Sequence, residues 1–277
     1  MSAERIVDTH AHIIDPQRFP FAAGPGYKPK LGESGTAEEY SATLDRHGVA
    51  HGVLVQPSGY GIDNRAILDA MRRYPGRFKA IAVLDAETPE RELRGLGEAG
   101  VVGVRFNLQS YRADALSGAV AGRYLGRLKE LGWFAQVFAD DAQWASATPL
   151  LAGSGVKVLV DHFGMRQARM GVEQAGFQAV LGLGRAGNAW VKLSAPFRIA
   201  DRLDGFAALD PVAEQLFAAF GAHGCLWGSD WPFINHADGF SYEAALAAVG
   251  RWLTEPLRRR QVLWDNPARI FGFGASP

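Results

Sequence analysis

Two histidines stand one residue apart near the start of the chain, in the stretch RIVDTHAHI at residues 5–13. In an extended chain successive side chains point to opposite faces, so His10 and His12 share a face and Ala11 points away. Histidine is the commonest metal ligand and the usual acid or base near neutral pH. The pair therefore predicts a site for a metal, an oxyanion or a proton, with two hydrogen-bonded histidines inside a barrel as the structural alternative.

Short apolar runs that are typical of buried strands recur along the chain and alternate with helical stretches. They lie at residues 5–8, 52–58, 79–84, 101–108, 133–139, 156–164, 189–197 and 225–232. Eight parallel strands joined by helices close naturally into a (β/α)8 TIM-type barrel. An open doubly wound sheet is the alternative, but no Gly-x-Gly-x-x-Gly turn follows the first strand to support it.

Helix starts are marked between several of these runs. Thr36 and Glu39 form a Thr-x-x-Glu capping box, and Asp63 is predicted to cap the helix that follows it. Pro89 and Pro211 are each predicted at a first helical position, where the missing N–H costs nothing.

Length and composition favour one soluble domain over residues 1–277. A chain of 277 residues suits a single barrel, for which about 250 residues is normal. We expect a distorted barrel, with a long loop from Asp15 to Gly35 lying over its C-terminal face. The hydrophobic content is 48% and the charged content 21%, which is typical of a globular protein with a large core.

The charge balance limits the expected partners. Lys plus Arg and Asp plus Glu both count 29, so nothing favours a nucleic-acid or anionic-membrane partner. The single cysteine, Cys225, excludes an intramolecular disulfide. With no apolar leader and no membrane-length apolar run, the sequence predicts a cytoplasmic protein, and it leaves a homo-oligomer open.

Polar residues gather where the predicted strands end. His10 and His12 end the first strand, Arg105 lies in the fourth, His162 follows the sixth and Asp230 ends the eighth. Arg198 follows the seventh. Active sites of TIM barrels lie at this C-terminal face, so these side chains are predicted to share one site.

The ordered set of motifs resembles a known family along the whole chain. DTHAH on the first strand, VDHFG on the sixth, GSDWP on the eighth and the closing DNPARIFGF are similar to the amidohydrolase superfamily, in its amidohydrolase-related (amidohydrolase-2) branch. Within that branch GVLVQPSGYGIDNRAIL, GVRFNL and VKLSAPFR most resemble the lactonases that open 2-pyrone-4,6-dicarboxylate.

The resemblance implies roles that hydrolysis of a lactone would need. Asp230 matches the aspartate that activates water in the superfamily, and His10, His12 and His162 would surround the carbonyl and the developing oxyanion. Guanidinium groups suit the substrate carboxylates. The proposed anchors are Arg105, which needs an anion inside its apolar strand, together with Arg112 and Arg198. Further hydrogen bonds to substrate are expected from Ser58, Tyr27 and Gln136.

The metal expectation departs from much of the superfamily. The fourth and fifth strands carry Arg105 and Gln136 and offer no histidine, so a two-metal site is not expected. One Zn or Mn ion on His10, His12 and Asp230, helped by His162, is the alternative. The resemblance to the lactonases implies instead that no metal is essential.

The sequence thus predicts a lactone hydrolase for a small polycarboxylate. The alternatives are a lactonase for a sulfonated or sugar lactone, a metal-dependent decarboxylase of the same branch, and a non-catalytic barrel that binds acids. His236, in the loop after the eighth strand, is predicted at the surface, with the mouth of the site as its alternative.

Overall fold

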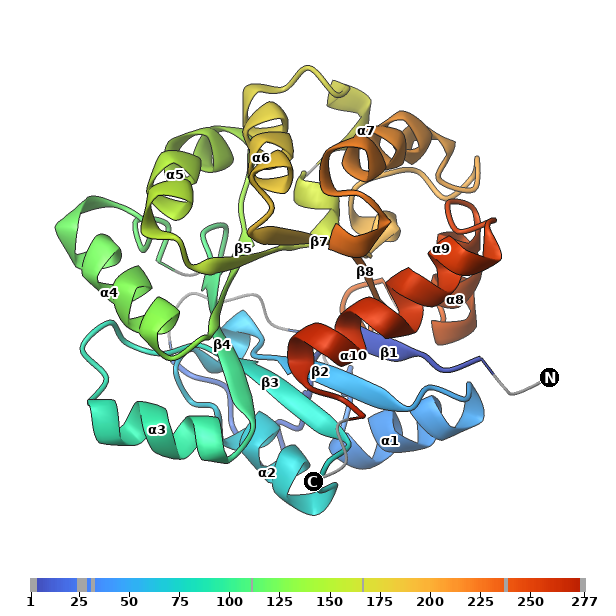
Figure 1. The fold of residues 1–277 in the computed structure, drawn as a ribbon. Coiled ribbons are helices and arrows are strands. Elements are labelled where there is room, and N and C mark those ends of the chain that lie inside the picture. The colour runs from blue at the N-terminus through green and yellow to red at the C-terminus, as the bar shows by residue number, and fades with distance from the viewer. Residues whose placement is uncertain are drawn as a thin grey trace.

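Eight parallel strands form one sheet in the order β1 to β8, with helices around the outside (Figure 1). The computed structural model describes residues 4–23, 29–30, 33–110, 112–165, 167–236 and 239–274. The strands are β1 Val7–Ala11, β2 His51–Val55, β3 Phe78–Ala82, β4 Val101–Asn107, β5 Phe134–Phe138, β6 Lys157–Val160, β7 Ala189–Ser194 and β8 Cys225–Gly228. The predicted (β/α)8 barrel is confirmed.

The first and last strands close the barrel through a few specific contacts. Ala11 bridges to Trp231, just beyond β8. The Asp230 N–H donates to the His10 carbonyl at 2.7 Å, and the His12 N–H donates to the Trp231 carbonyl at 2.8 Å. The seam that completes the barrel therefore runs through the residues predicted to do chemistry.

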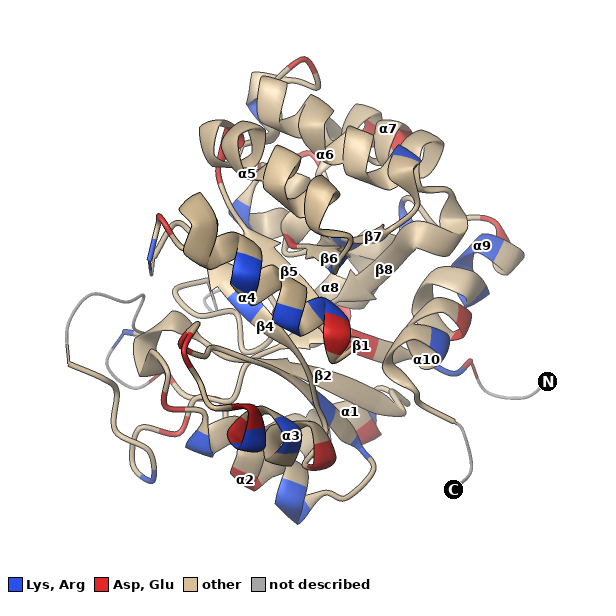
Figure 2. Ribbon diagram, turned by 60° about the vertical axis from the view of Figure 1, so that its left-hand side comes forward, with Lys and Arg blue, Asp and Glu red and all other residues tan. Residues whose placement is uncertain are grey.

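Helices cover the outer faces of the strands. They are α1 Ala37–Arg46, α2 Arg65–Arg73, α3 Glu90–Glu98, α4 Gly118–Glu130, α5 Asp141–Ser154, α6 Ala175–Ala186, α7 Asp210–Phe220, α8 Tyr242–Gly250, α9 Pro256–Arg260 and α10 Asn266–Phe271. Figure 2 shows Lys and Arg beside Asp and Glu on α3 and α4, which agrees with the balanced net charge. Within the described residues, none of the helices is both long and apolar enough to span a membrane.

The helix starts follow the sequence signals with three small shifts, one of which places Pro211 at the second position of α7 and not at the first. Thr36 caps α1 in the predicted box with Glu39. The cap of α2 is Asn64 and not Asp63, because the Asp63 carboxylate pairs with Arg65. Pro89 is the N-cap of α3, one position before the predicted one.

The two ends of the barrel interior differ in polarity. Its lower layer is apolar, with Val53, Ile81, Leu159 and Leu226 packed against Phe271 from the C-terminal segment. Charged and polar side chains fill the layer nearer the C-terminal face. The polar residues predicted to form a site therefore lie at the end of the interior nearer the C-terminal face.

The predicted strand runs extend beyond the observed strands into the loops at the C-terminal face. The run at 156–164 ends as a strand at Val160, because His162 and Phe163 take left-handed backbone angles, φ 50° and 58°. The run at 225–232 ends at Gly228, and Asp230 has φ 64°. These turns point the side chains of His162 and Asp230 into the barrel mouth.

The described parts of the β1 loop lie at the predicted face. The Ala22 N–H donates to the Gly59 carbonyl, after β2, at 3.0 Å. The Glu33 carboxylate accepts from the Asn235 N–H, after β8, at 2.9 Å. Both partners belong to loops that follow strands.

Candidate active site

A cavity of about 300 Å³ opens at the C-terminal face, between the loops that follow β1, β2 and β4 to β8. The predicted site residues that line it are His12, Ser58, Arg105, His162, Arg198 and Asp230. His10 and Gln136 lie outside this lining, and Arg112 lines a neighbouring cavity of about 290 Å³ instead. Tyr27 lies outside the described residues.

Asp230 is the buried centre of the site, with only 1% of its surface exposed. Its Oδ2 accepts a hydrogen bond from Arg198 Nε at 2.5 Å. Burial alone would raise the pKa of Asp230, but Arg198 and the facing histidines hold that pKa well below its ordinary value. The carboxylate is therefore ionised at neutral pH and can accept a proton.

Three imidazoles face the other oxygen of this carboxylate. Asp230 Oδ1 lies 3.2 Å from His12 Nε2, 3.6 Å from His10 Nε2 and 3.9 Å from His162 Nε2. The His-x-His pair and the sixth-strand histidine thus meet the eighth-strand aspartate, as the sequence predicts.

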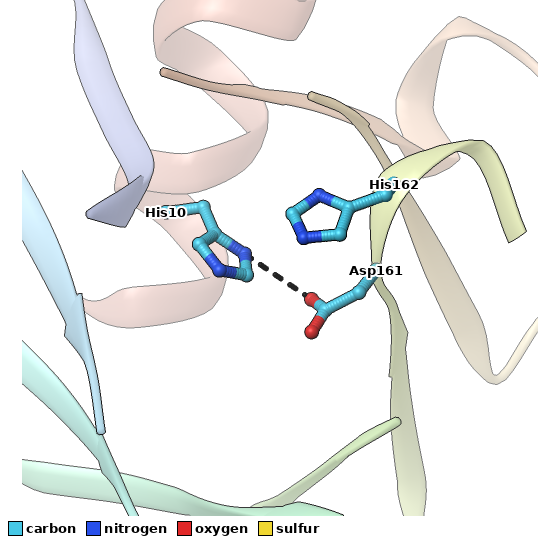
Figure 3. Close-up of side chains that lie close together, drawn as sticks. All are labelled: His10, Asp161 and His162. Carbon is cyan, nitrogen blue, oxygen red and sulfur yellow. Dashed lines mark ion pairs between the residues drawn. The ribbon is translucent and has the colours of Figure 1, made fainter. Parts of the chain in front are cut away.

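The partners of the Nδ1 atoms restrict where the protons of the His-x-His pair lie. His12 Nδ1 lies 2.7 Å from the Val55 carbonyl oxygen, which can only accept, so this nitrogen carries a proton. His10 Nδ1 lies 3.2 Å from Asp161 Oδ1 (Figure 3) and 3.4 Å from Lys192 Nζ, and burial lowers the pKa of His10 well below its ordinary value. If neutral His10 carries its proton on Nδ1, directed toward Asp161, its Nε2 is unprotonated. The His12 Nε2 contact to Asp230 then needs either a second proton on His12 or a cation.

The same atoms fit a single divalent ion. His10, His12 and Asp230 each offer one ligand atom, and these atoms lie within 4.8 Å of one another. His10 Nε2 is buried without a hydrogen-bond partner in the described structure. Asp161 behind His10 is the kind of carboxylate that orients a metal-bound histidine. The chemistry of this donor set suits Zn or Mn.

His162 occupies the wall beside His10. Its Nδ1 lies 2.9 Å from Ser194 Oγ, and the rings of His10 and His162 are tilted with centroids 4.6 Å apart (Figure 3). Burial lowers the pKa of His162 to about 4, although Asp230 and Asp161 oppose the shift. This imidazole is therefore neutral at pH 7 and can donate or accept one hydrogen bond.

A buried layer supports the histidines from beneath. Lys192 Nζ donates to Gln136 Oε1 at 2.7 Å and lies 3.6 Å from Asp161 Oδ1. Gln136 Nε2 donates to Asp161 Oδ2 at 3.2 Å. Burial lowers the pKa of Lys192 to about 8. Both polar atoms of Gln136 bind this layer and Gln136 does not line the cavity, so its contact with substrate stays a prediction that this arrangement does not support.

Neither Lys192 nor Asp161 was predicted to belong to the site. Lys192 stands between Val191 and Leu193 in an apolar strand, which is the same signal that identified Arg105. Asp161 directly precedes His162, and its side chain turns to His10.

The three predicted arginine anchors have different surroundings. Arg105 is 7% exposed, donates from Nη1 to the Gln56 carbonyl at 3.0 Å and approaches Asp161 Oδ2 only to 3.7 Å. Its Nε has no hydrogen bond in the described structure. Arg198 is bound to Asp230, and the exposed Arg112 pairs with Asp85 at 3.2 Å. Of the three arginines, Arg105 is therefore the one best able to bind a substrate anion.

Residues that the sequence did not assign to the site complete the wall. Asn107, Gln109 and Ser110 line the cavity from β4 and the loop after it. His236 lines it from the loop after β8, so its expected place at the surface is wrong. Residues in loops show no strand periodicity. The only sequence signal for placing His236 in the site was its position six residues after Asp230.

Fold and site together define a class: a (β/α)8 barrel with a His-x-His pair on β1 and an aspartate after β8 at one centre. The chain belongs to the amidohydrolase family, whose model matches residues 7–273.

The relatives share most of the length of this chain. It is 33% identical to a 4-sulfomuconolactone hydrolase from Rhizobium radiobacter, over 96% of this chain and 89% of that protein. It is 30% identical to a 2-pyrone-4,6-dicarboxylate hydrolase from Comamonas testosteroni, over 96% and 89%. The crystal structure of a probable 2-pyrone-4,6-dicarboxylic acid hydrolase from Acinetobacter baumannii, with citric acid bound, is similar at a TM-score of 0.88 and 31% identity, covering 97% of this chain and 99% of that one.

Proposed function

We propose that this protein is a lactone hydrolase whose substrate is a small lactone bearing acid groups, either 2-pyrone-4,6-dicarboxylate or a sulfonated analogue such as 4-sulfomuconolactone. The observation that carries the proposal is the ionised Asp230 carboxylate beside His12 and His162, in a cavity that also contains Arg105. The two relatives at 33% and 30% identity, whose names describe lactone hydrolases, support the same class.

Asp230 is the proposed general base. Its Oδ1 accepts a proton from water while the water oxygen forms a bond to the lactone carbonyl carbon. When the ring C–O bond breaks, the proton held on Asp230 passes to the departing ring oxygen. One water is consumed, and the product is an open-chain acid.

His12 and His162 are placed to stabilise the carbonyl oxygen as it gains charge. Both line the cavity and direct Nε2 toward the Asp230 carboxylate, next to which the carbonyl must lie for attack. Preorganised donors of this kind are worth about a hundredfold or more in rate. His10 is fully buried and acts on the site through Asp230 and the adjacent rings.

We propose that a proton on His12, and not an essential metal ion, lies between His12 and Asp230. The positive charges of Arg105, Arg198 and Lys192 already balance the buried carboxylates of Asp8, Asp161 and Asp230. A divalent ion would add two more charges where a proton adds one, at a larger cost in a poorly solvated site. If an ion does bind, His10, His12 and Asp230 would hold it, and it would polarise the carbonyl and lower the pKa of water.

The test is hydrolysis of both lactones by the purified protein, followed by loss of pyrone absorbance and by product analysis. Asp230→Asn should lower kcat by about a thousandfold, because the amide cannot take the proton. Citrate binding, measured by calorimetry, should persist in Asp230→Asn and show that the cavity is intact. Hydrolysis of neither lactone by the wild-type protein would refute the proposal, and release of carbon dioxide would indicate a decarboxylase instead.

A further inference from the structure

His236 is the one cavity residue whose imidazole makes no hydrogen bond within the described structure, although it lies in a wall of polar groups. It follows Asp230 by six positions and lines the cavity from the loop after β8. A turn fixes its backbone, because the His236 N–H donates to the Phe233 carbonyl at 2.7 Å. The residue is half-buried and borders the cavity.

Phe197 holds this imidazole beside Arg198. The Phe197 ring centroid lies 5.1 Å from that of His236, and the Arg198 guanidinium carbon lies 5.0 Å from the same Phe197 ring. Phe197 is 5% exposed and is itself packed against Phe233 and Phe240. The buried phenyl ring therefore fixes two cationic or hydrogen-bonding groups at one side of the cavity.

The surroundings of His236 are electropositive. Burial lowers the pKa of His236, and the charges of Arg198 and Arg202 lower it further. Arg198 itself is engaged by Asp230 at Nε and by the Ile234 carbonyl at 3.4 Å. An anion at this side would therefore enter a positive field in which His236 offers an uncommitted N–H.

Arg105 and His236 stand at opposite sides of the barrel mouth. Arg105 is on β4 and His236 follows β8, and strands four apart in an eight-stranded barrel face each other. Asp230, His12 and His162 line the cavity between them. A lactone with two acid groups could thus place one at each side while its carbonyl meets the base.

We infer that His236 forms the second acid-binding subsite of the cavity and holds the carboxylate or sulfonate group of the substrate that is remote from Arg105. The inference rests on the proposed lactone hydrolase function for the identity of the substrate, but the subsite itself is defined by Phe197, His236 and the charge of Arg198. In place of the predicted anchors Arg105, Arg112 and Arg198, we infer that Arg105 binds one acid group and His236 binds the other.

The first experiment compares His236→Gln and His236→Asn with His223→Gln, which alters an exposed histidine before β8. Loss of one hydrogen bond to an acid group should raise KM for 2-pyrone-4,6-dicarboxylate about tenfold and change kcat less than about twofold. The control should leave both constants unchanged. A fall in kcat at constant KM would overturn the assignment.

Monoacid substrates test the contact directly. Either 2-pyrone-4-carboxylate or 2-pyrone-6-carboxylate lacks the group bound by His236, and for that compound alone His236→Gln should not change KM. Equal sensitivity of both monoacids and the diacid would overturn the subsite. With 4-sulfomuconolactone, a similar rise in KM identifies the sulfonate or carboxylate of that lactone as an occupant, whereas an unchanged KM limits the subsite to pyrone carboxylates.

Citrate binding separates this inference from the proposed function. If the wild-type protein hydrolyses none of these lactones, a tenfold weaker citrate affinity in His236→Gln, absent in His223→Gln, still establishes the subsite. If the lactones are hydrolysed while His236→Gln changes neither KM nor citrate affinity, the subsite is refuted and the hydrolase function stands.

Discussion

The Arg198 guanidinium is bound to the carboxylate of Asp230, with Nε 2.5 Å from Oδ2. The sequence placed Arg198 among the substrate anchors, but its nearest carboxylate is that of the protein itself. The pair fixes one oxygen of the base and leaves Oδ1 toward His12 and the cavity. We therefore propose that Arg198 positions Asp230 and does not bind substrate.

Arg198→Met should lower kcat about a hundredfold and change KM by less than about threefold. Without Arg198, the Asp230 carboxylate loses both the group that orients it and the charge that compensates it. Arg198→Lys should recover part of kcat, since it restores the charge without the planar donor. Steady-state kinetics on 2-pyrone-4,6-dicarboxylate measures both constants. Arg185→Met, on the exposed end of α6, serves as the control. A large rise in KM with an unchanged kcat would show instead that Arg198 binds the substrate.

Removal of metal should leave activity within about twofold, because a proton on His12 can occupy the place between His12 and Asp230. Protein stripped by a chelator is assayed before and after Zn or Mn is added, and its metal content is measured in parallel. Activity that disappears on stripping and returns with one equivalent of ion would show that His10, His12 and Asp230 are ligands.

The sequence predicted the barrel and its centre because those features have local signals. Each strand was an apolar run, and His10, His12 and Asp230 ended such runs. The partner of Arg198 had no local signal, since an arginine after a strand suits a substrate anion and a protein carboxylate equally.

The sequence also could not predict how deep inside the barrel a side chain ends. Arg105 and Gln136 are paired in register on β4 and β5, so strand periodicity treats them alike. The longer Arg105 side chain reaches the cavity, whereas Gln136 stays in the layer with Lys192 and Asp161. Side-chain length and the buried partners separate the two positions.

Lys192→Met should lower the free energy of unfolding by about 3–5 kcal/mol, because it leaves the fully buried Asp161 carboxylate without its ammonium partner. Urea unfolding at pH 7 measures the difference. The exposed Lys129→Met on α4 is the matched control, with an expected change of about 0.5 kcal/mol or less. A loss as small as that of the control would show that Lys192 does not stabilise the layer beneath His10.

Asp8 on β1 binds Ser229, which follows β8 and precedes Asp230. Its carboxylate accepts from the Ser229 N–H at 2.8 Å and the Ser229 hydroxyl at 2.6 Å. It also accepts from the His10 N–H at 3.1 Å and from the hydroxyls of Tyr40 and Tyr242, each at 3.0 Å. Asp8 is fully buried, so these five donors replace its lost hydration.

Asp8→Asn should therefore affect catalysis as well as stability. An amide has one acceptor oxygen in place of two, which leaves buried donors unpaired and lowers the free energy of unfolding by about 1–3 kcal/mol. Because Asp8 holds β1 to β8, the distance between His12 and Asp230 should loosen, and kcat should fall about tenfold in the folded protein with little change in KM. Tyr40→Phe and Tyr242→Phe each remove one donor but keep the carboxylate, so they should lose about 1 kcal/mol and retain kcat. If Asp8→Asn is destabilised yet keeps its wild-type kcat well below its unfolding temperature, the seam between β1 and β8 supports the fold alone and the geometry of the site is set elsewhere.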